Sequence, residues 1–285
     1  MTRVNTIDDA VVQKTWARLL DSPRWEMAPV KNPLLLVDDL PSGATVTMGC
    51  FANSEGFQKS IELTAAIIAR GFEVIPHLPT RSLTGRDHLK DVLDAYRDAG
   101  VADIFVVAGN TKKPAGPYDG ALEALEDIAA AGFRIGVGAY PEGHLYMDEA
   151  AAFELLRRKQ EYASYLVTQT CFDAEAFRSW LTRLREAEVS LPAHLGIAGV
   201  VQRKELIRMA GALGFGASMK FISKQRSLAT KMMLPGAYDP TGLLTDVARV
   251  AADASLGVSD VHLNTFNQVA STRAWWDGLR GKTSS

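Results

Sequence analysis

The chain has 285 residues, of which 47% are hydrophobic and 8% aromatic, a composition ordinary for a globular protein with a large core. A net charge of −2 gives no basic footprint for nucleic acid, and no apolar run approaches the roughly 20 residues that a membrane span needs. The start of the chain lacks the apolar centre of a signal peptide, so we expect a cytoplasmic protein in which Cys50 and Cys171 stay reduced.

The predicted elements begin with an amphipathic N-terminal helix within residues 1–22. Short apolar runs rich in β-forming residues then alternate with segments of helical period, an order that indicates a parallel sheet. The predicted strands cover residues 25–29, 44–49, 73–78, 103–108, 134–139, 165–169, 193–197 and 260–265. Three of the intervening segments carry an apolar stripe and end at a glycine, as helices commonly do.

Eight strands in this alternation favour a closed (β/α)8 TIM barrel over an open sheet. We therefore expect a single domain over residues 1–285, with the barrel at 23–270 and a C-terminal tail at 271–285. The interval between the first two strands is short, so the first barrel helix must be short as well. The long interval before the last strand leaves room for two or three extra helices.

Polar groups follow the predicted strands at the end where the loops of a barrel converge, which is where catalytic groups lie in this fold. Each has a structural alternative when taken singly, because histidine and glutamine satisfy backbone groups, threonine favours strands and tyrosine packs with its hydroxyl in water. Their convergence on one mouth favours a binding site instead. The residues are Glu26, Thr47, His77, Gly109, Asn110, Tyr140, His144, Gln169, Thr265 and Asn267.

The sequence lacks the motifs of several classes of enzyme. It contains no zinc-type histidine spacing, no Gly-x-Ser-x-Gly elbow, no P-loop and no Gly-x-Gly-x-x-Gly fingerprint. We expect no metal site and no Rossmann-type dinucleotide site. Without a Rossmann acid or its arginine substitute, the sequence leaves the choice between NADH and NADPH open, as it does the oligomeric state.

Five stretches, "WEMAP", "VIPHL", "GAYPEGH", "VTQTCFD" and "NTFNQ", stand in this order at the predicted strand ends. Together they resemble the methylenetetrahydrofolate reductase family, and the similarity runs from about Trp25 to Gln268. The resemblance implies a barrel enzyme of one-carbon metabolism. Such an enzyme moves hydride from NAD(P)H, ordinarily through FAD, to 5,10-methylenetetrahydrofolate and forms 5-methyltetrahydrofolate for methionine biosynthesis or for demethylation-linked recycling.

The resemblance also implies roles for individual residues. Glu26 matches the general acid that protonates a folate nitrogen and opens the five-membered ring to an iminium, which requires a carboxylic acid kept protonated by desolvation. Gln169 matches the glutamine that binds the pterin ring, and Asn110 and Phe172 are expected to contact the folate substrate. The residues expected to line the cofactor site are Thr47, His77, Gly109, Asn110, Tyr118, Tyr140, His144, Arg158 and Lys159.

Three departures from the family pattern concern the flavin. Asn110 stands where relatives carry an acid, and an amide there would raise the reduction potential of a bound flavin. Ala152 and Leu155 stand where relatives offer polar partners, and two lost hydrogen bonds at about 1 to 3 kcal/mol each would weaken FAD binding by roughly 10²-fold or more. The first barrel helix is also abbreviated. We expect FAD binding to be weak or absent, in which case nicotinamide would pass its hydride directly to the iminium.

Two alternatives keep the folate site. One is a different one-carbon enzyme attached to a demethylation pathway, and the other is a non-catalytic tetrahydrofolate carrier serving such a pathway. Glu26 discriminates between an enzyme and a carrier, because a carrier needs Gln169 but has no use for the acid. Barrel lyases for phosphorylated substrates form a weaker rival, since the last loops lack a glycine-rich phosphate cradle.

Overall fold

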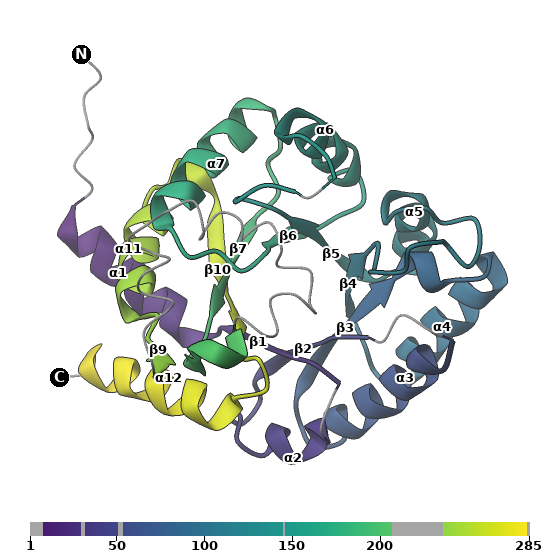
Figure 1. Cartoon of the computed structure of the whole chain (residues 1–285), viewed down its shortest axis with the longest axis horizontal. Coiled ribbons are helices and arrows are strands. Elements are labelled where there is room, and N and C mark those ends of the chain that lie inside the picture. The colour runs from purple at the N-terminus through teal and green to yellow at the C-terminus, as the bar shows by residue number, and fades with distance from the viewer. Residues whose placement is uncertain (1–7, 30–31, 51–53, 145, 207–235, 284–285) are drawn as a thin grey trace.

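The computed structural model describes residues 8–29, 32–50, 54–144, 146–206 and 236–283. Eight parallel strands close into a barrel in the order β1-β10-β7-β6-β5-β4-β3-β2 (Figure 1), which confirms the predicted fold. All eight predicted strands are present. They are β1 Arg24–Met27, β2 Thr45–Met48, β3 Glu73–Pro79, β4 Asp103–Val107, β5 Arg134–Ala139, β6 Tyr165–Thr168, β7 Ala193–Ala198 and β10 Val258–Asn264.

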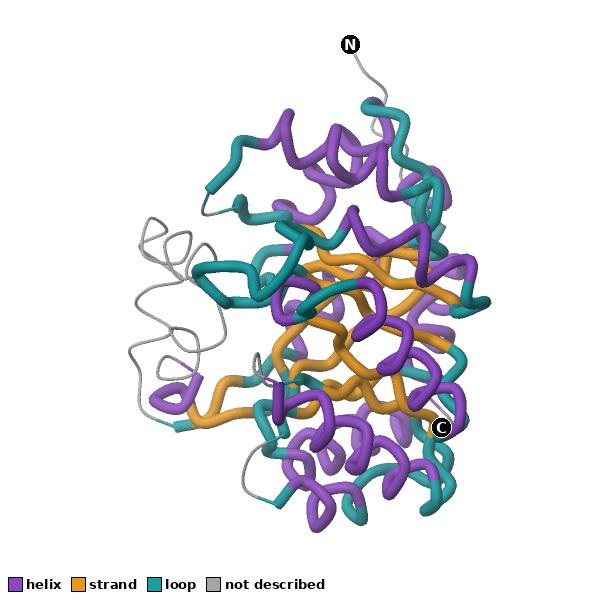
Figure 2. Tube along the Cα trace, turned by 90° about the vertical axis from the view of Figure 1, so that its right-hand side faces the viewer, coloured by secondary structure: helices purple, strands orange, loops and turns teal. Residues whose placement is uncertain are grey.

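Helices surround this barrel, and the side view shows them on both sides of the strands (Figure 2). They are α1 Asp9–Asp21, α2 Pro33–Val37, α3 Ser54–Ile68, α4 Arg86–Asp98, α5 Leu122–Ala130, α6 Glu149–Lys159, α7 Ala174–Glu186, α11 Thr241–Ala251 and α12 Val269–Thr283, with 3-10 turns η1 Thr80–Ser82 and η2 Ala254–Leu256. Helix α2 has only five residues, as the short first interval predicts. None of the described helices is long and apolar enough to cross a membrane.

The segment expected as a C-terminal tail belongs instead to helix α12. Trp276 of this helix is 1% exposed and packs edge-on against Trp25 of β1, with ring centroids 6.3 Å apart. Its indole N–H donates to the carbonyl of Leu20 at 3.1 Å. Burial of so large a side chain stabilises the docked helix by a few kcal/mol, so the segment is part of the helical layer and not a free tail.

The long interval before the last strand contains a feature that the sequence did not predict. Residues Val201–Gln202 (β8) and Ala237–Tyr238 (β9) pair as a small antiparallel sheet beside the barrel. Helix α11 follows and is one of the two or three extra helices expected there. Most of the remaining interval, residues 207–235, lies outside the described residues.

The amino-terminal half of the barrel interior is filled by a charged network. The guanidinium of Arg24 lies 4.1 Å from the centre of the Tyr165 ring, whose hydroxyl donates to Asp103 at 2.7 Å. Arg24 and Arg134 approach the same carboxylate at 3.7 and 3.9 Å. Gly136 is required beside this ring, because a Cβ there would fall 2.4 Å from the Tyr165 side chain. A ligand site inside the barrel must therefore lie toward the carboxyl ends of the strands.

Candidate active site

The centre of the mouth is a carboxylate held by a histidine. Glu26 and His262 lie on the neighbouring strands β1 and β10, and the Oε2 of Glu26 is 2.6 Å from the Nε2 of His262. The imidazole is almost fully buried, with 1% of its side chain exposed, whereas the Glu26 side chain is 27% exposed. The carboxylate is thus fixed on one side and open to a ligand on the other.

Asn264 extends this contact toward strand β6. In the amide orientation that satisfies both of its polar groups, its nitrogen donates to both carboxylate oxygens of Glu26, at 2.9 and 3.2 Å. Its oxygen then accepts from the hydroxyl of Thr170 at 2.8 Å. Thr47, a predicted site residue on β2, lies 3.4 Å from the Nε2 of His262 through its hydroxyl. This array joins Glu26 to the residue that follows Gln169.

The electrostatic surroundings favour the ionised form of Glu26 in the ligand-free protein. Burial alone would raise its pKa, but the hydrogen bond from His262 and the electrostatic interactions with His262 and His77 outweigh burial and lower the pKa. Burial lowers the pKa of His77 to about 4, so this ring is neutral at pH 7. Its Nε2 is buried and finds no hydrogen-bond partner among the described residues, which makes it a candidate ligand contact beside the acid.

Gln169, the expected pterin contact, is half-buried at the end of β6. Its Oε1 accepts from the backbone N–H of Thr170 at 3.0 Å. The amide nitrogen makes no hydrogen bond to the described part of the chain, so this donor is available to a ligand. Phe172, the other expected folate contact of this loop, is 8% exposed and packs edge-on against Tyr238 of β9, with centroids 5.7 Å apart.

The carboxylate of the "YPEGH" loop has a structural role that the sequence did not reveal. Glu142 accepts hydrogen bonds from the backbone N–H of Phe172 and the thiol of Cys171, both at 2.9 Å. Burial and this carboxylate raise the pKa of Cys171 well above its usual value, so the thiol stays protonated and donates. Glu142 thereby ties the loop after β5 to the loop after β6.

Two polar residues that follow the last strand, β10, also have structural roles. The Thr265 hydroxyl donates to the carbonyl of Glu26 at 2.7 Å, and the Asn267 amide exchanges two hydrogen bonds of 2.9 Å with the backbone of Ala28. Both side chains join the loop after β10 to the loop after β1, although their position predicted polar groups facing a ligand. His262 and Asn264, inside the strand, face the acid instead.

The expected cofactor residues are more scattered. Tyr140 and His144 form an edge-on pair with ring centroids 4.5 Å apart at the end of β5. Burial, and secondarily Lys159, lowers the pKa of His144. Lys159 on α6 is 8% exposed, and burial lowers its pKa to about 8 with partial compensation from Glu123. His144 thus contacts Tyr140 directly and interacts electrostatically with Lys159.

Other expected cofactor residues lie apart from this group. Arg158 is exposed on α6, and Asn110 is exposed after β4. Gly109 has a positive φ of 88°, and a Cβ there would meet Pro79 at 2.9 Å, so this glycine allows close approach of two loops. Tyr118 is 3% exposed within the aliphatic core, where burial and the charge of Asp127 on α5 raise its pKa.

The described residues do not fit FAD as the family resemblance requires. Helix α6 presents Ala152 and Leu155, which offer no side-chain hydrogen bond, at positions where polar partners are expected. The Tyr118 hydroxyl is buried and has no hydrogen-bond partner within the described chain, but it sits in the core and not at the mouth. A flavin would therefore lose several of its polar contacts, each of which contributes about 1 kcal/mol.

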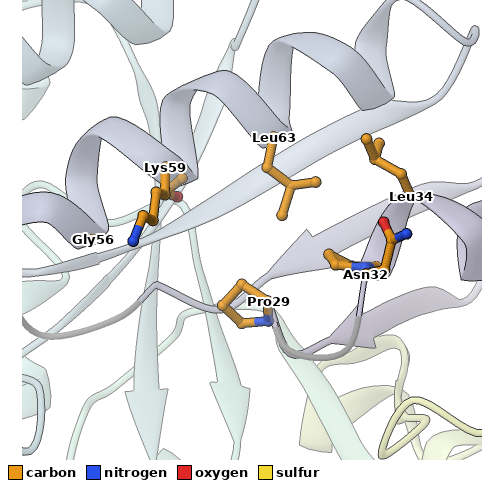
Figure 3. A pocket seen from close by; sticks show the side chains of 8 residues that line it. Pro29, Asn32, Leu34, Gly56, Lys59 and Leu63 are labelled. Carbon is orange, nitrogen blue, oxygen red and sulfur yellow. The ribbon is translucent and has the colours of Figure 1, made fainter.

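A separate small pocket of about 140 Å³ lies beside the mouth, between the loop after β1 and helix α3 (Figure 3). Its walls are mainly apolar and include Pro29, Leu34 and Leu63, with Lys59 at one side. Ligand sites for drug-sized molecules usually measure about 300 to 1,000 Å³. This pocket is too small for a folate or a dinucleotide. The described residues also contain no group of three or more potential metal ligands.

The barrel, with a carboxylate and two histidines at its carboxyl-terminal mouth, has the arrangement of an enzyme site. The sequence profile of the family described as Methylenetetrahydrofolate reductase matches residues 34–279. The chain therefore belongs to the methylenetetrahydrofolate reductase family.

Individual relatives are distant. Methylenetetrahydrofolate reductase 2 of Saccharomyces cerevisiae is 23% identical over 211 residues, which cover 69% of this chain and 35% of that protein. Methylenetetrahydrofolate reductase 1 of Schizosaccharomyces pombe is 32% identical over 80 residues, or 27% of this chain and 13% of that protein. The chain thus spans about a third of the first relative's length. The solved structure of an intracellular xylanase from Thermoanaerobacterium saccharolyticum shares the fold, with a TM-score of 0.50, 11% identity and 88% coverage of each chain.

Proposed function

We propose that this protein reduces 5,10-methylenetetrahydrofolate to 5-methyltetrahydrofolate with NAD(P)H. The observation that carries the proposal is the Glu26 carboxylate, fixed at 2.6 Å by His262 and linked through Asn264 to the loop of Gln169. A pterin bound by the free amide nitrogen of Gln169 would lie beside this acid. Family membership supports the folate substrate.

In the proposed reaction, protonated Glu26 donates its proton to N10 of the folate as the bond between N10 and the methylene carbon breaks. The electron pair of N5 forms the N5=CH2 iminium. Hydride from C4 of the reduced nicotinamide then adds to this carbon and gives the methyl group. One proton and one hydride are consumed, nicotinamide is oxidised, and Glu26 is left as a carboxylate that must take up a proton before the next turnover.

The ligand-free pKa of Glu26 lies below its usual value, so substrate binding must favour the acid form. Covering the exposed part of the carboxylate removes water from it, and this desolvation raises its pKa. Glu26 would therefore take up a proton as the folate binds. A buffer-dependent uptake of protons on binding, measured by titration calorimetry, tests this step.

We propose direct hydride transfer from nicotinamide to the iminium, because the described residues do not fit FAD. The test combines the visible absorption spectrum of the purified protein with turnover of 4-deuterated NADH and NADPH. Direct transfer predicts no flavin absorption and retention of the deuterium in the methyl group. A tightly bound flavin that NAD(P)H bleaches, with deuterium lost to water during turnover, would overturn the direct route. Failure of both nucleotides to be consumed would overturn the reductase itself.

A tetrahydrofolate carrier is the second candidate, and the lowered pKa of Glu26 favours it, because a permanent carboxylate binds but does not protonate. Its signature would be tight folate binding without oxidation of NADH or NADPH. The same assay, run with a measurement of folate affinity, separates the two functions.

A further inference from the structure

We propose that His262 is a positioning residue that holds the Glu26 carboxylate and stabilises the anion left after proton transfer to the substrate. This inference rests on the proposed function, in which Glu26 is the acid. Its basis is the 2.6 Å contact between the Nε2 of His262 and the Oε2 of Glu26. His262 is 1% exposed, so its ring is held by the barrel interior and would not touch the substrate itself.

The proton on the imidazole can be assigned from its surroundings. The Nδ1 of His262 is buried and has no hydrogen-bond partner among the described residues. A buried N–H without an acceptor is rarer and more costly than a bare acceptor nitrogen. The proton therefore lies on Nε2, where it donates to Glu26. A donor aimed at a carboxylate stabilises the ionised form of that carboxylate.

Groups from every neighbouring strand face this pair. Glu26 is met by Asn264 from β10 through an amide N–H and by His77 from β3. His262 is met by the hydroxyl of Thr47 from β2 and acts electrostatically on His194 of β7. Burial lowers the pKa values of His77 and His194 to about 4 and about 2, so both rings are neutral in the working pH range. Neither supplies a competing positive charge at neutral pH.

A general acid must hold a proton and also release it, and the two requirements conflict in a closed site. Desolvation by a bound folate favours the protonated form of Glu26, but by itself it would make the acid too weak to give up its proton. The Nε2–H of His262 stabilises the carboxylate that forms during transfer. His262 and the bound ligand thus act in opposite directions on the same group and keep its acidity between the two extremes.

The test compares the pH dependence of kcat, which reports the enzyme–substrate complex, for the wild type, His262→Leu and His262→Gln. The rate requires protonated Glu26, so kcat is constant below the pKa of Glu26 in the complex and falls above it. Leucine removes the donor, which raises the pKa of Glu26 and should move this fall about one to two pH units upward, with at least a tenfold lower plateau. Glutamine retains an N–H near the position of Nε2, and its fall should stay within about half a pH unit of the wild type.

A matched control is His194→Leu, which removes another buried barrel histidine, 6% exposed, that no hydrogen bond or ion pair among the described residues joins to Glu26. It should change the thermal midpoint without moving the pH profile. A shift as large in His194→Leu as in His262→Leu would overturn the inference. So would a His262→Leu profile that falls at the wild-type pH, or a His262→Gln profile that matches leucine.

NMR spectroscopy of the wild-type histidines tests the inference even if a variant fails to fold or the protein has no reductase activity. With the five histidines labelled with 15N, His262 should show a protonated Nε2 whose proton resonates far downfield, and Glu26→Gln should move that signal upfield. An unprotonated Nε2 at neutral pH would overturn the inference. A wild-type protein that does not oxidise NAD(P)H would instead overturn the proposed function. Failure of the inference about His262 and failure of the proposed function therefore give different results.

Discussion

The two sides of the barrel mouth differ in how their polar groups are organised. On the acid side, Glu26, His262, Asn264 and Thr170 form one continuous array in which each contact measures between 2.6 and 3.2 Å. On the side that the family resemblance assigns to the flavin, formed by β4, β5 and α6, the expected residues are divided among the core, the mouth and the outer surface.

We propose that this difference reflects which part of the family site the chain uses. An array of buried polar groups is stable only when its members satisfy one another, so its loss or retention tends to involve several residues together. The acid side retains a complete set. The opposite side presents Ala152 and Leu155 on α6 and has Tyr118 in the core, an arrangement that is consistent with the proposed reaction without FAD.

The largest expected effect is on the acid side. Glu26→Gln keeps the size and the contact with Asn264 but cannot donate an acidic proton, so kcat should fall about 10²- to 10⁴-fold. Folate affinity, measured by calorimetry, should change less than about threefold. Glu73→Gln, at the amino-terminal end of β3 where the carboxylate accepts from Thr45 at 2.9 Å, is the matched control and should leave turnover intact. Near-normal turnover of Glu26→Gln would instead favour the carrier.

The barrel and the position of Glu26 on its first strand could be predicted from the sequence, but the histidine beside this carboxylate could not. Strand alternation and terminal glycines are local signals, and they located every barrel strand. His262 lies inside a strand, two residues before its end, and its role depends on the register that places β10 beside β1. A single sequence does not show which residues inside the strands face one another, so His262 was not among the predicted site residues.

Helix α12 and the burial of Tyr118 could not be predicted for a related reason. Gly278 and Gly281 weaken the helical pattern of the C-terminal segment, which is fixed by the burial of Trp276 against another part of the chain. The family resemblance implies a cofactor contact for Tyr118, whose side chain packs against the hydrophobic core. Tertiary packing decided both cases, and local patterns do not record it.

Substitution of Gln169 separates folate binding from the chemical step on the acid side of the mouth. Gln169→Leu removes the amide that is free to bind the pterin while keeping the approximate shape of the side chain. The KM for folate should rise about 10- to 100-fold, as expected for one lost hydrogen bond to a ligand that is left unsatisfied, with a smaller change in kcat. Gln160→Leu is the control, because that amide donates to the carbonyl of Glu188 at 3.0 Å away from the mouth. An unchanged KM would place the pterin elsewhere.

Substitution of Lys159 tests whether the flavin side of the site binds an anionic ligand. Its folded-state pKa of about 8 lies below the usual 10.5, so the fold disfavours its charged form. Stability from this group is therefore fully present above about pH 10.5 and is lost as the pH falls through 8. Lys159→Met should be more stable than the wild type at pH 7, by about 1 to 3 kcal/mol, with a difference that shrinks toward pH 10.5.

Urea unfolding at pH 7 and pH 10 measures this difference, with exposed Arg158→Met as the control that should show no such pH dependence. The KM for NAD(P)H in the same variants adds the functional reading. A Lys159→Met protein that gains stability but loses nucleotide affinity would show that the amine serves a phosphate. The two sides of the mouth would then both be binding surfaces, and only the flavin contacts would have been lost.

The smallest effect is expected for Tyr118→Phe. The hydroxyl is buried without a hydrogen-bond partner among the described residues, and removing an unsatisfied polar group is neutral or slightly stabilising. The free energy of unfolding should therefore stay within about 0.5 kcal/mol of the wild type or rise, with kcat and both KM values unchanged within about twofold. Phenylalanine preserves the packing against the core, so a tenfold loss of nucleotide or flavin affinity could come only from the hydroxyl. That result would mean that ligand binding draws Tyr118 out of the core and rebuilds the side of the mouth that lacks an array in the ligand-free protein.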